Sequence, residues 1–144
     1  MSHSSRRLAG VLLVLFPTVV YGGVTVLRLL IDRASGYADN PLRQDLWRAG
    51  HAHAGVLLIL SLVVLRYVDE AVLPDWLKGA VRHTTPAAAI LLPTAYFLSV
   101  LSPTATEPNG LIYLAFVGAA VLAVGLFALG VGLLRPPEAS GEAE

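Results

Sequence analysis

Cysteine is absent from this sequence of 144 residues, which excludes disulfides, thiolate metal sites, cysteine nucleophiles and thiol redox chemistry. The only methionine is Met1, which argues against a methionine-lined copper path. Charged residues make up only 14% of the chain, where a soluble domain usually has about a quarter. The formal net charge is zero and no basic patch stands out, so we expect no nucleic-acid partner.

Long apolar segments separate the few stretches that hold the charges. Their ranges are 8–31, 46–67, 81–101 and 111–134. A run of about 18 or more apolar residues can cross the hydrocarbon of a bilayer as a helix, and these runs are too long for barrel strands. We therefore predict an all-α polytopic membrane protein, a four-transmembrane-helix up-and-down bundle over residues 1–135. Residues 136–144 are expected to form a disordered cytoplasmic tail.

Basic residues set the expected orientation, because short cytoplasmic loops carry an excess of them. The N-terminus, the second loop and the C-terminal flank hold such residues, whereas loop 102–110 has none. We therefore expect a multi-pass protein of the cell membrane with both termini in the cytoplasm. The first loop holds three arginines, accompanied by three aspartates, and so weakens the asymmetry.

Small residues recur at helical spacing within three of the four segments. Helices in lipid associate by close packing at such residues, because burial out of lipid gives no hydrophobic gain. We expect these stripes to face one another in a compact bundle, or alternatively to form part of a dimer interface. They comprise Gly118, Gly125 and Gly132; Gly50, Ala54 and Ser61; and Thr18, Gly22 and Thr25.

Two histidines, His51 and His53, lie in the first turns of segment 46–67. Ionisable residues inside a span are rare and expensive, so they are functional candidates by default. Residues two apart on a helix differ by about 200° in direction, so these imidazoles cannot chelate one metal as an i, i+4 pair would. The direction midway between them passes close to Ala54. We expect the two imidazoles to flank one helix–helix contact.

Other polar side chains occur at a similar depth. Tyr21, Arg28 and Asp32 share one face of segment 8–31, and the last two are spaced for an ion pair. Tyr96 lies at the corresponding level of segment 81–101. The predicted site is therefore a cluster in the outer leaflet, whose candidate cofactor-binding residues are His51, His53, Tyr21, Arg28 and Tyr96.

Three interpretations of this cluster remain open. In the first, His51 or His53 is an axial ligand of a b-type haem, or both bind a metal ion, with Tyr21, Tyr96 and Arg28 around them. In the second, the cluster handles protons or a small solute, which requires an oligomer of such short bundles. In the third, the histidines bond to headgroups or to a partner, and the protein is an accessory subunit of a membrane complex or a homodimer.

The string Arg-Ala-Gly-His-Ala-His-Ala-Gly at 48–55, together with Pro-Thr-x-x-Tyr-Gly-Gly at 17–23, resembles small four-helix bacterial integral membrane proteins. That resemblance covers most of the chain and implies the fold but no activity. A His-x-His element that opens a transmembrane helix is also similar to segments of haem-copper oxidases and their relatives. Those proteins carry further ligand histidines on other helices, and their absence here argues against a binuclear centre.

Overall fold

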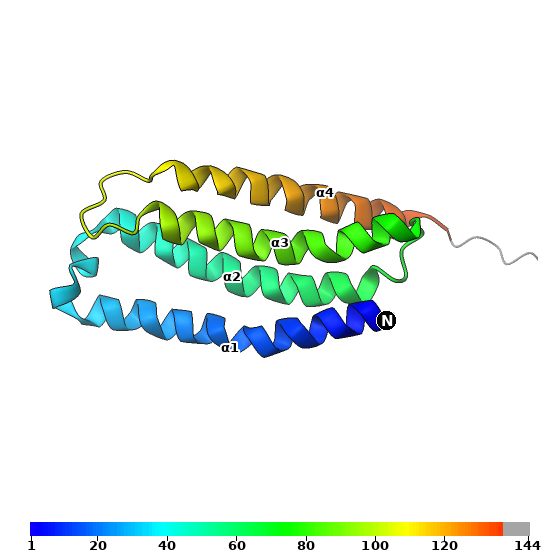
Figure 1. Ribbon diagram of the computed structural model, residues 1–144, viewed down its shortest axis with the longest axis horizontal. Helices are drawn as coiled ribbons and strands as arrows, with labels where there is room; N and C mark the ends of the chain where they lie inside the picture. Colours follow the sequence, from blue (N-terminus) through cyan, green and yellow to red (C-terminus); the bar gives the residue numbers. More distant parts are fainter. Residues whose placement is uncertain (137–144) are drawn as a thin grey trace, which may run out of the picture.

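The computed structural model describes residues 1–136, all of whose regular elements are helical (Figure 1). The all-α prediction is therefore confirmed for this part of the chain. The four long helices are α1, His3–Ile31; α2, Pro41–Tyr67; α3, Asp75–Ser99; and α4, Leu114–Leu134. Short 3-10 helices precede α2 (η1, Arg33–Ser35, and η2, Tyr37–Asp39) and α4 (η3, Gly110–Tyr113). The predicted tail lies outside the described residues, apart from Pro136.

Helices α1 and α2 begin earlier than the apolar runs that predicted them, because polar residues cap their first turns. The Ser2 hydroxyl accepts a hydrogen bond from the Ser5 amide at the start of α1. At the start of α2, the Asn40 side chain accepts from the Arg43 amide, and Pro41 occupies the first helical position. Both devices satisfy or avoid the orphan N–H groups of a helix start.

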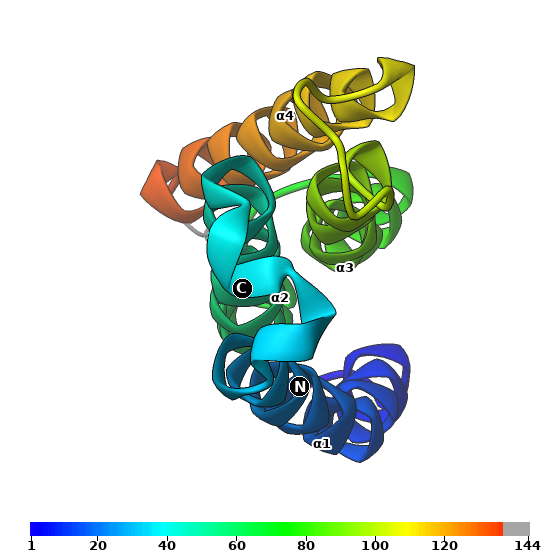
Figure 2. The ribbon, with the colours of Figure 1, turned by 90° about the vertical axis from the view of Figure 1, so that its left-hand side faces the viewer.

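The helices run up and down, with α2 and α3 in the middle of the molecule (Figure 1). Viewed from the end, α1 lies below this central pair and α4 lies above it (Figure 2). The chain start, the α2–α3 loop and the end of α4 meet at one end of the bundle, here called the terminal end. The opposite end, which holds η1, η2 and the loop before η3, is called the loop end.

Three helical stretches are long and apolar enough to cross a membrane: His3–Ile31, Pro41–Tyr67 and Gly110–Leu134. Helix α3, which includes Arg82 and His83, is not among them. Large apolar side chains point outward on these stretches; Val14 is 79% exposed and Phe127 is 76% exposed. Such extensive apolar surface is typical of a face that contacts lipid or another protein. The structure therefore supports a helical membrane protein with three candidate spans.

The predicted glycine stripe of α4 packs against α3 and the α2–α3 loop. A methyl group at Gly125 would lie 2.0 Å from Oγ1 of Thr84, and one at Gly118 would lie 3.1 Å from the Leu91 Cβ atom. Gly132 is close to Leu73 in the same way. The expectation that the three small-residue stripes face one another was therefore wrong for α4. Its glycines at 118 and 125 instead let α4 lie close against side chains of α3.

Candidate functional site

His51 projects from α2 toward α1, where it lies over two consecutive glycines. A methyl group at Gly23 would lie 2.8 Å from Nε2 of His51, and one at Gly22 would lie 3.8 Å from Nδ1. The imidazole therefore occupies space that a side chain on α1 would otherwise fill. The Gly22–Gly23 pair allows α1 and α2 to approach at this level with a half-buried imidazole between them.

His53 projects from the other side of α2, toward α3. Its ring centroid lies 5.2 Å from that of Tyr96, with the planes tilted by 45°. Nδ1 of His53 lies 2.7 Å from the carbonyl oxygen of Ala49, to which it can donate a hydrogen bond. That bond would leave Nε2 as the free nitrogen. The two imidazoles thus point to different neighbouring helices, as their spacing in the sequence predicts.

Tyr21 and Arg28 lie elsewhere, on the exposed face of α1. Tyr21 is 74% exposed, and Arg28 lines a shallow apolar hollow with Val24, Leu27, Ile31 and Asp32. The expected ion pair between Arg28 and Asp32 is not among the salt bridges of residues 1–136. The Asp32 carboxylate instead accepts from the Ala34 amide. The structure therefore brings His53 and Tyr96 together but places Tyr21 and Arg28 on a separate surface.

The donor geometry bears on the predicted haem or metal site. Within the described residues, no group of three or more His, Cys, Asp or Glu side chains is placed to hold a metal ion. His51 and His53 face different helices, so they do not form a chelating pair within one chain. Ligation of haem or a metal by either histidine stays a prediction, and one axial histidine is enough to hold a haem.

A buried cluster at the loop end was not anticipated from the sequence. The Arg43 guanidinium lies 4.6 Å from the ring centroid of Trp47, and its Nε donates to the Val100 carbonyl at 3.1 Å. Tyr37 packs against Trp47 at 5.6 Å and is 1% exposed, and its hydroxyl has no hydrogen-bond partner among residues 1–136. Burial raises the pKa of the Tyr37 hydroxyl, although the positive charges of Arg48 and Arg43 oppose that shift. The i, i+4 spacing of Arg43 and Trp47 was the available signal.

A second polar cluster joins the start of α1 to α2 and α3 at the terminal end. The Asp69 carboxylate accepts from the Arg82 guanidinium at 2.7 Å and from the Ser2 amide at 2.6 Å. Arg82 also donates to the Ser5 hydroxyl at 3.0 Å. Burial by itself would raise the pKa of the Asp69 carboxyl, but these hydrogen bonds outweigh it and hold the pKa well below the ordinary value. The cluster therefore fixes the N-terminus of α1 against the α2–α3 connection.

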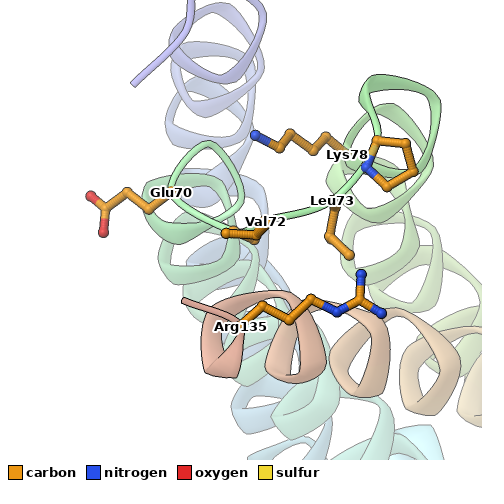
Figure 3. Close-up of a pocket in the computed structure, with 7 residues that line it drawn as sticks. Glu70, Val72, Leu73, Lys78 and Arg135 are labelled. Atoms are coloured by element: carbon orange, nitrogen blue, oxygen red, sulfur yellow. The ribbon is translucent and has the colours of Figure 1, made fainter. Parts of the chain in front are cut away.

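A hollow also lies at the terminal end, between the α2–α3 loop and Arg135 (Figure 3). Its volume is about 570 Å³, and in the close-up the Glu70 carboxylate points away from the other labelled side chains. The Lys78 ammonium donates to the Asp69 carbonyl at 3.4 Å. The histidines of α2 contribute nothing to this hollow, which is lined mainly by loop residues.

Comparisons with known proteins add no relative to these observations. The chain matches no protein-family model, no curated protein and no solved structure. The resemblance to small four-helix bacterial membrane proteins therefore stays a prediction, and the function has to be argued from the geometry alone.

Proposed function

We propose that the protein is a subunit of a complex in the cell membrane and that it binds its partner through the exposed face of α1. In this proposal all four helices cross the bilayer and both termini lie in the cytoplasm. Helix α3 has 25 residues, which at 1.5 Å per residue give about 37 Å, enough to cross about 30 Å of hydrocarbon. Its less apolar composition suits a central helix that contacts other helices more than lipid.

The supporting observation is the outward polar face of α1. Only 6% of the most apolar stretch of α1 is buried, against 28% for α2. On this face Tyr21, Arg28 and Asp32 are exposed on a helix that is otherwise apolar. Ionisable side chains at such positions usually pair with one another or face a bundle interior. A partner helix that offers complementary polar groups would give Arg28 and Asp32 the ion-pair partners that residues 1–136 do not provide.

Transport by one bundle is a weaker interpretation, because the polar clusters of the described residues lie toward the two ends of the bundle. Aliphatic side chains pack between them, in clusters such as the one around Leu57, Ala88 and Leu92. A proton or solute path needs polar groups through the whole thickness of the membrane.

Photocrosslinking in intact membranes tests the proposed α1 interface. A photoreactive residue at position 21 should crosslink α1 to a specific partner or to a second copy of the chain. The same residue at position 56 of α2 is the matched control, because Val56 is 63% exposed on another helix. Arg28→Leu should abolish the crosslink from position 21, whereas Val124→Leu on the exposed surface of α4 should leave it unchanged. Crosslinking of position 21 to lipid alone would refute the proposal.

The purified assembly also tests the predicted haem or metal site, because a bound cofactor would be purified with it. Ligation by His51 or His53 predicts a Soret band, or metal in fixed proportion to protein, that is lost on His51→Ala or His53→Ala. Colourless and metal-free protein from a haem-replete host would dispose of this interpretation and leave the subunit proposal unaffected.

A further inference from the structure

A long groove follows the junction of α1 and α3 through the terminal half of the bundle. Its deeper part is a hollow of about 270 Å³ between these two helices, with α2 as its floor. Its only hydroxyl, that of Thr18, donates to the Leu15 carbonyl at 2.7 Å and is therefore already bonded. The lining is otherwise apolar and comprises Leu12, Leu15, Val19, Ala54, Leu58, Pro86, Ala89 and Ile90.

A second hollow continues this groove toward the terminal end. Its volume is about 390 Å³, and it is lined by His3, Ser4, Arg7, Leu8, Val11 and His83. The two hollows follow one another along the same pair of helices, because Leu8 and Leu12 lie one turn apart on one face of α1 and His83 precedes Pro86 by about one turn of α3. The groove therefore has an apolar interior and a mouth that opens at the end of the bundle.

The mouth is lined by basic side chains. Arg7 and two imidazoles line it, and no carboxylate does. His83 Nδ1 lies 2.9 Å from the Gly79 carbonyl, so Nε2 is the nitrogen left for a ligand. The Asp69 carboxylate at the same end of the bundle is already bound by Arg82. A negatively charged group at this mouth would meet unopposed basic side chains.

We propose that this groove binds an anionic phospholipid, with its phosphate at Arg7 and His83 and one acyl chain along α1 and α3. The dimensions fit one leaflet. Eleven residues separate Arg7 from Thr18, about 16 Å along the helix, which is close to half of the roughly 30 Å hydrocarbon core. Basic pockets between transmembrane helices at the cytoplasmic surface are known to hold anionic headgroups. The site lies on the half of α1 near the terminal end, apart from the Tyr21–Arg28 face. Lipid binding there is therefore independent of the partner proposed for that face.

Native mass spectrometry of the detergent-purified full chain tests this site. Phosphatidylglycerol and phosphatidylcholine with identical acyl chains are added in turn, and one retained phosphatidylglycerol per chain is expected. Each basic residue near the surface contributes about 1 kcal/mol, so Arg7→Gln should weaken phosphatidylglycerol binding about fivefold. Arg6→Gln is the matched control, because Arg6 is an exposed neighbour on α1 that lines neither hollow.

A second variant tests whether the acyl chain occupies the apolar part. Ala89→Leu fills the hollow and should reduce the retention of both lipids, whereas Ala119→Leu on the exposed surface of α4 should not. Equal retention of the two lipids by the native chain would overturn the proposal, as would equal effects of Arg6→Gln and Arg7→Gln. Unchanged binding by Ala89→Leu would do the same. Displacement of phosphatidylglycerol by inorganic phosphate at equal concentration would identify a phosphate site instead of a lipid site.

Discussion

Substitution of Gly125 by alanine is a direct test of how α4 is held against α3. The added methyl group would lie 2.0 Å from Oγ1, 2.5 Å from Cβ and 2.9 Å from Cγ2 of Thr84. Rotation of the Thr84 side chain moves Oγ1 and Cγ2 but not Cβ, which is fixed to the backbone of α3. The two helices must therefore separate by about 1 Å to reach an ordinary contact distance, with the loss of neighbouring packing.

The expected change in the free energy of unfolding follows from two opposing effects. Overpacking of a close contact costs about 1–3 kcal/mol, whereas alanine in a helix interior is about 0.5–1 kcal/mol better than glycine. Gly130 provides the matched control on the same helix, because a methyl group there meets nothing within 4 Å. Gly130→Ala should be neutral or slightly stabilising. The difference between the two variants isolates the packing effect, for which we expect about 1–3 kcal/mol.

Reversible unfolding in mixed micelles, followed by far-UV circular dichroism during an SDS titration, measures this difference. Removal of the Thr84 Cβ atom gives an internal check. Gly125→Ala should lower the free energy of unfolding much less in a Thr84→Gly background than in the native chain. If Gly125→Ala and Gly130→Ala unfold at the same SDS fraction, α4 does not pack on α3 through Gly125 and the described contact is refuted.

Three further measurements probe the other clusters. Because the pKa of Asp69 is lowered in the folded protein, its ionised carboxylate contributes fully to stability above the ordinary pKa of 3.8, and this contribution is lost as the pH falls below that value. Acid should therefore lower the unfolding midpoint. Asp69→Asn should lower the free energy of unfolding at neutral pH and remove most of that acid dependence. Arg43→Met deletes a buried hydrogen bond and a cation–π contact and should cost roughly 2–3 kcal/mol, with a shift in Trp47 emission; unchanged stability and emission would contradict the described cluster. Gly23→Ala should displace the His51 ring, which NMR of labelled histidine would detect as a shift confined to His51; an unperturbed resonance would show that the ring does not lie on Gly23.

Much of the secondary structure could be predicted from the sequence. Apolar runs of sufficient length predict helices because the backbone must satisfy its own hydrogen bonds in lipid. The predicted and observed C-termini of α1, α2 and α4 coincide at Ile31, Tyr67 and Leu134. Helices α1 and α2 start at earlier residues than predicted, because the polar caps around Ser2 and Asn40 extend them beyond their apolar residues.

The candidate site was predicted less completely. The helical period fixes the angle between His51 and His53 on one helix, and the structure agrees with that angle. Periodicity on α1 likewise groups Tyr21 with Arg28, but it does not say which face meets α2. When a helix is apolar on almost every face, its sequence does not indicate which face packs inside the protein and which points outward. The contact of Gly22 and Gly23 with His51 decides that orientation, and it turns Tyr21 and Arg28 outward.

The sequence by itself determined the helical class, the approximate bounds of the helices and the opposed directions of the two imidazoles, because these depend on local hydrogen bonding and helical geometry. Only the tertiary structure decided that the α4 glycines contact α3, that Arg43 is buried beneath Tyr37 and Trp47, and that His51 rests on α1 while His53 rests on Tyr96. These contacts join segments far apart in the chain, and close packing of small and large side chains selects among them. The two histidines are therefore parts of two different helix contacts.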